Sequence, residues 1–280
     1  MGIRKILHKI KMVFVRQKEN SLPILTDEKL YGSWGEDCCA LEIKEKLQNC
    51  KIKKNVTINS AIGKAEIDFL VFYNDKLFAI EVKNWKGDIN ELEDGDFLQE
   101  KYDCNQKVHK SPFKQLERAI FLLKKQQRHK VWINDIILFL GADEVNVQTD
   151  KNWFDSVEEM IEYMKTSGEE SNEMEARLFL DECTSSDIIY GKEYYKKLYC
   201  NVSDQSLIFQ TERGVVTRKD ISTIDISHHL TYDELDILLK DGSVQKVVVE
   251  NQKIFVKEGD GSVGEYALCK LDYIQLGDYI

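Results

Sequence analysis

The stretch that decides the fold runs from Glu66 to Lys83 and reads EIDFLVFYNDKLFAIEVK. Two apolar runs, 66–73 and 77–83, flank the dipeptide Asn74-Asp75. Asparagine and aspartate tolerate the left-handed backbone angles of a tight turn. The pattern therefore predicts two neighbouring antiparallel strands joined by a short hairpin.

Charged side chains interrupt this apolar stretch in a pattern typical of a metal site. Asp68 lies inside the first run, where a buried carboxylate needs a cation, a metal or hydrogen-bond donors to offset its desolvation. The two-residue period of a strand places Glu81 and Lys83 on one face, and Asp68 on the paired strand can point to the same side. Carboxylate oxygens suit Mg²⁺ or Mn²⁺, and a lysine nearby can position a water or stabilise developing negative charge. The pattern indicates metal-assisted hydrolysis of a phosphodiester.

The segments around the hairpin carry helical and strand patterns in turn. Apolar spacing predicts helices at 34–47, 113–127 and 152–165, further strands at 51–59 and 135–140, and a long polar connection over 84–111. The order up to residue 140 is therefore helix, three strands, helix and strand. From residue 198 onward short strands are expected at regular spacing, and the clearest hairpin joins 235–239 to 244–249 around Asp241-Gly242.

This order, with the pattern D-x12-E-x-K of Asp68, Glu81 and Lys83, resembles the PD-(D/E)XK nuclease superfamily and, within it, the nuclease-related domain (NERD) family. The resemblance covers residues 32–145. The matching segments are Gly35-Glu36, Glu66-Ile67-Asp68, Glu81-Val82-Lys83-Asn84-Trp85-Lys86-Gly87 and Ser111-Pro112-Phe113-Lys114-Gln115. In the last of these, serine replaces the asparagine that is usual in the family.

The resemblance implies an α/β fold with a restriction-endonuclease-like αβββαβ core, in which helices flank a mixed sheet, followed here by a small β-rich C-terminal domain. It also implies that Asp68, Glu81 and the Val82 carbonyl hold the divalent ion and that Lys83 orients the attacking water. Glu36 and Gln115 would support the site. Taken alone, Glu36 is equally typical of an acid at a helix N-terminus, and Gln115 of a helix position that faces solvent. Trp85 and Gly87 are interpreted as structural residues that set a turn after the strand.

Charge divides the chain into two parts. The net charge is -10 and the pI about 5.2, which is not the profile of a basic nucleic-acid-binding protein. Residues 1–130, however, carry 25 basic and 19 acidic side chains, a net of +6, and residues 131–280 carry 14 and 30, a net of -16. We therefore expect phosphate contacts in the first part, although such residues also suit a merely solvated face. The candidate contacts are Lys51, Lys53, Lys54, Lys107, Lys110, Lys114 and Arg118.

The termini and the cysteines bear on domain organisation and compartment. Residues 1–18 combine six basic side chains with apolar residues at helical spacing, which predicts an amphipathic helix that either packs on the domain or contacts a membrane surface or a protein. The polar run 166–175 predicts a boundary, so the expected domains are 1–30, 31–168 and 176–280. Seven cysteines without a C-x-x-C pair argue against a disulfide framework and a zinc knuckle. We expect a reducing, cytoplasmic compartment, with the protein either free or peripheral to the membrane.

These observations predict a Mg²⁺- or Mn²⁺-dependent nuclease that hydrolyses DNA, and the resemblance suggests a role in DNA processing or in defence against foreign DNA. The alternative is a catalytically silent nucleic-acid or membrane-surface adaptor with the same fold, and a third interpretation is cleavage of RNA. The acidic C-terminal domain is expected to bind a protein partner or to restrain the nuclease. The sequence is also compatible with an oligomer.

Overall fold

The computed structural model describes residues 28–101, 105–191, 194–196, 200–258 and 262–277. The chain divides between Thr184 and Ser185 into two compact units, whose described parts are 28–184 and 185–277. The helix predicted for residues 1–18 lies outside the described residues. None of the described helices is both long enough and apolar enough to cross a membrane, and all six described cysteines are free thiols.

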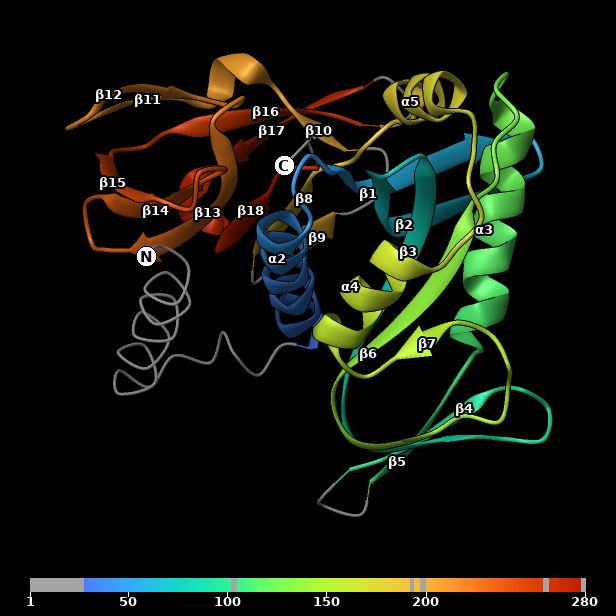
Figure 1. Ribbon diagram of the computed structural model, residues 1–280. Coiled ribbons are helices and arrows are strands. Elements are labelled where there is room, and N and C mark those ends of the chain that lie inside the picture. Colours follow the sequence, from blue (N-terminus) through green and yellow to red (C-terminus); the bar gives the residue numbers. More distant parts are fainter. Residues whose placement is uncertain (1–27, 102–104, 192–193, 197–199, 259–261, 278–280) are drawn as a thin grey trace. The chain divides into compact units, whose positions relative to one another are not determined.

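The first unit is a mixed sheet flanked by helices, which confirms the predicted α/β fold class (Figure 1). Its elements are α2 (Glu28–Lys46), β1 (Lys51–Ser60), β2 (Gly63–Tyr73), β3 (Lys76–Glu91), β4 (Phe97–Glu100), β5 (Gln106–His109), α3 (Pro112–Gln126), β6 (Asn134–Asn146), β7 (Trp153–Phe154), α4 (Val157–Thr166) and α5 (Glu173–Glu182). Strands β1 to β5 are neighbours in chain order, and β6 pairs with β3 in parallel. The core order from α2 to β6 thus contains the expected αβββαβ sequence, with β4 and β5 added.

The hairpin that the sequence predicts is present between β2 and β3. Asn74 and Asp75 form the turn with φ angles of 46° and 61°, and Tyr73 faces Lys76 on either side of it. Both turn residues therefore occupy the left-handed region that asparagine and aspartate tolerate.

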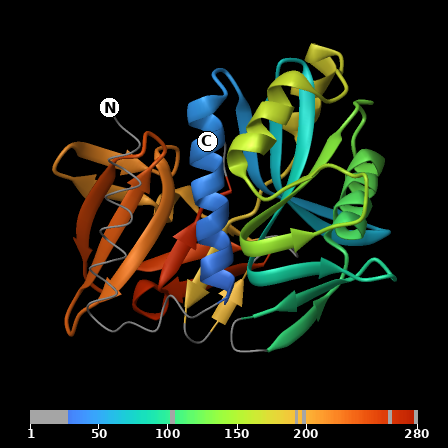
Figure 2. The ribbon, with the colours of Figure 1, turned by 60° about the horizontal axis from the view of Figure 1, so that its bottom comes forward.

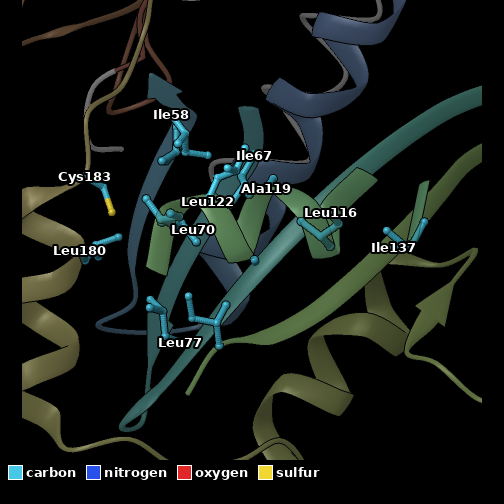
Figure 3. Close-up of a cluster of buried hydrophobic side chains, with 14 of the residues drawn as sticks. Ile58, Ile67, Leu70, Leu77, Leu116, Ala119, Leu122, Ile137, Leu180 and Cys183 are labelled. Carbon is cyan, nitrogen blue, oxygen red and sulfur yellow. The ribbon is translucent and has the colours of Figure 1, made fainter. Parts of the chain in front are cut away.

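The two faces of the sheet are covered by different helices (Figures 1 and 2). Near their turn, alternate residues of β2 and β3 belong to different cores. Phe69 and Ile80 pack with α2 and α4, whereas Leu70 and Ala79 pack with α3 and α5. This alternation follows from the two-residue period of a strand that is buried on both sides. Figure 3 shows the second core, where residues of β1 to β3 meet those of α3 and the end of α5.

The prediction of a long connection over 84–111 is wrong, because strand β3 continues to Glu91 and β4 and β5 extend the sheet. Ile89 and Phe97 are fully buried within this polar stretch. These two apolar residues seat the short strands on the core, and the polar side chains of Asp96 and Gln99 are buried with them. The helix predicted at 152–165 begins only at Val157, because Trp153–Phe154 pair with β6 as a short parallel strand.

Helix α5 was not predicted, because the polar run 166–175 conceals its start. Asn172 is the N-cap, and its side chain accepts a hydrogen bond of 3.1 Å from the Glu175 amide. An asparagine followed three residues later by a glutamate is an N-cap signal, and this signal stood at the end of the polar run. The units divide after α5, while the predicted domain limits of 31–168 and 176–280 remain predictions.

The end of α5 is anchored to β1. Lys53 reaches into the space beyond the last turn, where a helix leaves carbonyls without partners. Its Nζ donates to the carbonyls of Leu180 (3.1 Å), Asp181 (3.4 Å) and Cys183. The Thr57 amide donates to the Thr184 carbonyl at 2.8 Å. The chain thus leaves the first unit directly from strand β1.

The second unit is β-rich, as expected. Its strands are β8 (Ile188–Gly191), β9 (Tyr194–Lys196), β10 (Asn201–Val202), β11 (Ile208–Thr211), β12 (Gly214–Thr217), β13 (Ile221–His228), β14 (Asp233–Leu239), β15 (Val244–Val249), β16 (Lys253–Lys257), β17 (Val263–Ala267) and β18 (Tyr273–Gln275). Six of them form a sheet in the order β15-β14-β13-β18-β8-β9. The predicted hairpin around Asp241-Gly242 joins β14 to β15, with Gly242 at a φ of 81°.

A buried ion pair fixes the entry of the chain into this unit. Asp187 is completely buried, and Arg218 donates to both of its carboxylate oxygens at 2.8 Å. The amides of Val202 and Gly277 donate to the same carboxylate at 2.6 and 3.0 Å. A bidentate guanidinium and two amides together replace the hydration that Asp187 loses on burial.

Candidate active site

The candidate site lies where strands β2 and β3 separate. Their pairing runs from the turn to Phe69 and Ile80 and goes no further. Beyond this last pair, the Val82 amide donates to the Asp68 side chain, at 2.8 Å from Oδ2, instead of to a backbone carbonyl of β2. Asp68 is 7% exposed. Its carboxylate is therefore fixed to β3 by a buried hydrogen bond at the fork between the strands.

Strand β1 is irregular opposite this point. Lys54 pairs with Phe69 and Val56 with Ile67, while Asn55 between them has a φ of 47°. A left-handed residue inside a strand turns its peptide away from the regular ladder. Asn55 carries only a weak signal in the sequence, namely that asparagine tolerates this conformation.

Glu81 and Lys83 lie on one face of β3, as predicted. The face is the one that carries Leu77 and Ala79, since positions two apart share a side. Lys83 Nζ lies 2.5 Å from Glu81 Oε1, and the side chains are 17% and 12% exposed. The two groups form an ion pair that is largely shielded from water.

Helix α2 brings a third carboxylate to the site. Glu36 is 7% exposed, and its charge acts on Lys83 together with the charges of Glu81 and Asp68. The glycine before it explains how the helix comes so close. A Cβ at Gly35 would lie 2.5 Å from Asn84 Nδ2, so glycine lets α2 approach β3 at this level without displacing the Asn84 side chain. The structure thus brings Glu36, Asp68, Glu81 and Lys83 together.

Burial and neighbouring charges shift the pKa values of Glu81 and Lys83. Burial, followed by the charge of Asp68, raises the pKa of Glu81 to about 7 although Lys83 opposes the shift. Burial alone would lower the pKa of Lys83, but the charges of Glu81 and Asp68 outweigh it, and the pKa lies above its ordinary value. The lysine is therefore held as an ammonium, and one ammonium stands among several acids.

A divalent cation fits this set of residues. A buried carboxylate with a raised pKa gains from a nearby cation, and hard oxygen ligands are those that Mg²⁺ and Mn²⁺ prefer. Within the described part of the chain, no three His, Cys, Asp or Glu side chains form a group ready to hold a metal. Cys39 offers no thiolate, because burial raises its pKa above the ordinary value. Asp68, Glu81 and the Val82 carbonyl remain predictions as metal ligands.

Gln115 stands apart from these residues. It lies in the first turn of α3 and is exposed. Among the described residues, no hydrogen bond joins its side chain to Asp68, Glu81 or Lys83, so its supporting role remains a prediction. Ser111 acts as the N-cap of α3, accepting from the Lys114 amide at 3.4 Å, and Pro112 occupies the first turn. Serine and asparagine cap helices about equally well, which accounts for serine at this position.

Trp85 and Gly87 hold the extension of the sheet and do not form a turn. Gly87 has a φ of 88°, and a Cβ there would lie 2.0 Å from the Glu100 carbonyl oxygen. The pairing between β3 and β6 shifts register on both sides of Gly87. Trp85 stacks on His109 of β5 with ring centroids 4.1 Å apart. The expected turn is therefore a bulge, at which β3 continues and the added strands are fastened.

Two of the candidate phosphate contacts are corrected. Lys54 is 0% exposed and Lys53 is 9% exposed with its Nζ committed to the end of α5, so neither ammonium faces solvent. Adjacent residues of β1 point to opposite faces of the sheet, and both faces are covered here, so both lysines are buried. A run of lysines in the sequence does not reveal this. Lys107, Lys110, Lys114 and Arg118 are exposed and Lys51 is half-buried. Lys110 pairs with Asp96 at 2.6 Å, and Lys114 donates to the Asp94 carbonyl at 2.9 Å.

Comparison with known families gives one match. Residues 31–140 match a family model described as nuclease-related domain (NERD). This span contains most of α2, the fork between β2 and β3, helix α3 and the first half of β6. No curated protein and no solved structure matches the chain.

Proposed function

Residues 31–140 form a nuclease-related domain, and from this premise we propose that the chain is a divalent-metal-dependent nuclease that hydrolyses the phosphodiester bonds of DNA. The observation that carries the proposal is the meeting of Asp68, Glu81, Lys83 and Glu36 at the fork between β2 and β3. Paired acids and a lysine in a shielded site suit in-line hydrolysis of a phosphate ester.

In this proposal each residue has a defined task. Asp68 and Glu81, with the Val82 carbonyl, hold Mg²⁺ or Mn²⁺, which when bound neutralises charge on the phosphate and makes water a better nucleophile. Asp68 is kept in place by the Val82 amide, so its orientation does not depend on the ion. Lys83 orients the attacking water and stabilises negative charge that develops on the phosphate oxygens. The charges of Glu81 and Asp68, with a smaller contribution from Glu36, keep Lys83 protonated.

The substrate is proposed from the basic surface near the site. Lys107, Lys110, Lys114 and Arg118 lie on β5, the loop after it and α3, where exposed cations can neutralise phosphates. Such contacts make affinity fall as salt rises. A role in DNA processing or in defence against foreign DNA is consistent with a nuclease of this kind, and the acidic C-terminal unit is proposed to bind a protein partner or to restrain cleavage.

A cleavage assay with a matched pair of variants tests the proposal. Plasmid, linear and single-stranded DNA and RNA are incubated with Mg²⁺, Mn²⁺ or EDTA and with the wild type, Lys83→Ala or Lys219→Ala. Lys219 is an exposed lysine of the other unit, so its variant controls for the loss of one positive charge. We expect DNA cleavage that requires metal, is unchanged in Lys219→Ala and is slower by about a hundred-fold or more in Lys83→Ala.

Two outcomes contradict the proposal. If wild type and Lys83→Ala behave alike under every condition, the enzyme assignment fails, and retained DNA binding would then favour the silent adaptor. If only RNA is cleaved, the active site stands and the substrate assignment is wrong.

A further inference from the structure

Helix α3 presents a cationic face with an aromatic residue at its centre. Its buried side is apolar, whereas its exposed positions are Lys114, Gln115, Glu117, Arg118, Phe121, Lys124, Lys125 and Gln126. Glu117, the one acid of this helix, pairs with Lys151. Phe121 is 54% exposed. A large aromatic side chain that is exposed among positive charges indicates a contact surface rather than a merely solvated face.

A second exposed ring lies next to this face. Trp132, just after α3, is 56% exposed, and the Nζ of Lys124 lies 5.6 Å from its ring centroid. Lys125 Nζ lies 5.5 Å from the centroid of Phe121. The backbone of Trp132 is fixed, since its amide donates to Ser171 Oγ at 2.9 Å and its carbonyl accepts from that hydroxyl at 3.1 Å. Each ring is thus paired with a lysine, and the tryptophan is held at the surface by its backbone.

The first turn of α3 is linked to the candidate active site through three successive contacts in the core. Lys83 pairs in register with Phe139, whose ring lies 5.7 Å from Phe97, and Phe97 lies 6.0 Å from Phe113 in the first turn of α3. The 15 residues of α3 then extend over about 22 Å. A strand that runs along the helix from the site would therefore pass Phe121 before it reaches the end of the helix.

We infer that this face of α3, together with Trp132, binds single-stranded DNA that enters or leaves the active site; the inference rests on the proposed nuclease function. Bases stack on Phe121 and Trp132, and the ammonium groups of Lys124 and Lys125 move from the rings to the phosphates. Stacking requires bases whose faces are open, which a paired duplex does not offer. The cations fit a polyanion, and each ring has a lysine ammonium beside it.

Fluorescence anisotropy with a labelled oligo(dT) of 12 nucleotides tests the inference, in EDTA so that no strand is cut. The full chain is compared as wild type, Phe121→Ala/Trp132→Ala and Phe255→Ala. Phe255 is 45% exposed on β16 of the other unit, so its variant controls for removal of one exposed ring. We expect the double variant to bind oligo(dT) about ten-fold or more weakly than the wild type does. A 12-bp duplex is expected to bind the double variant and the wild type equally well. Phe255→Ala is expected to bind oligo(dT) like the wild type.

Tryptophan emission gives an independent readout. In Trp132→Phe a flat ring remains for stacking, while an indole that is 56% exposed is lost. We expect oligo(dT) to quench the emission of the wild type, and the quenching to fall by at least half in Trp132→Phe with the anisotropy-derived affinity retained.

Three results overturn the inference. The first is equal affinity of wild type and double variant for oligo(dT). The second is an equal loss of affinity for oligo(dT) and for the duplex. The third is binding to vesicles of phosphatidylserine that depends on both rings, with oligo(dT) binding unaffected. If plasmid is still cleaved when one of these three results is found, the nuclease proposal stands and only the strand-binding face is wrong. If oligo(dT) binds through the two rings but no DNA is cleaved, the strand-binding face stands and the nuclease proposal is wrong.

Discussion

Replacing Gly35 by alanine is expected to disturb the candidate active site through helix α2. The added Cβ would lie 2.5 Å from Nδ2 and 3.1 Å from Cγ of Asn84. Asn84 directly follows Lys83 in β3, and Glu36 directly follows Gly35 in α2. The methyl group therefore either displaces the Asn84 side chain, next to Lys83, or pushes apart the two segments that carry the acid and the lysine.

The magnitude follows from two opposing terms. Overpacking of a tight contact costs about 1–3 kcal/mol, while alanine is up to about 1 kcal/mol better than glycine inside a helix. We expect a net loss of about 1–2 kcal/mol in the free energy of unfolding. The effect on cleavage is larger, because a displacement of about 1 Å at a reacting centre can lower the rate about a hundred-fold.

A second substitution provides the decisive comparison. Asn84→Ala removes Nδ2 and Cγ and leaves the Asn84 Cβ at 3.4 Å from the new methyl, an ordinary contact distance. Urea unfolding and plasmid cleavage are measured for the wild type, both single variants and the double variant. We expect the double variant to recover most of the loss of Gly35→Ala, with a coupling energy of about 1 kcal/mol or more. Losses that add without coupling, or a Gly35→Ala variant that matches the wild type, would refute the steric reasoning.

Three further variants test other parts of the structure. Gly87→Ala meets the Glu100 carbonyl and a positive φ together, so we expect a loss of about 2–4 kcal/mol in urea unfolding, and a loss below 1 kcal/mol would contradict the role given to the bulge. Asp187→Ala leaves the Arg218 guanidinium and two amides without their acceptor, and we expect a loss of about 3–5 kcal/mol confined to residues 185–277 in hydrogen exchange. All four tryptophans lie before residue 185, so the urea midpoint by tryptophan emission should stay near that of the wild type if the units unfold separately. Lys53→Met removes the donor at the end of α5, and we expect a loss of about 1–3 kcal/mol in stability with the salt dependence of DNA binding unchanged. A decrease of that salt slope in Lys53→Met would instead restore Lys53 as a phosphate contact.

The elements that carry the site were predictable because their signals are local. The turn at Asn74-Asp75 follows from two residues that accept left-handed angles, and Glu81 and Lys83 share a face because strands have a two-residue period. The helix that begins at Pro112 follows from apolar spacing and a capping serine.

What the sequence could not predict depends on contacts between distant segments. Lys53 and Lys54 read as exposed cations, since nothing local says that β1 would lie between β2 and the end of α5. The polar stretch after Lys83 read as a loop, because its strands are fixed by isolated buried residues such as Ile89 and Phe97. The position of Gly35 against Asn84 likewise becomes visible only when helix and strand are packed together.

The anchoring of α5 on β1 has a mechanical consequence. Thr184 is bonded to Thr57 in the first unit, and Asp187 is bonded to Arg218 in the second. Only Ser185 and Ser186 lie between these two anchors, and two residues span at most about 7 Å of extended chain. The connection therefore has almost no slack. The first of the two anchors is on β1, the strand paired with β2, which carries Asp68.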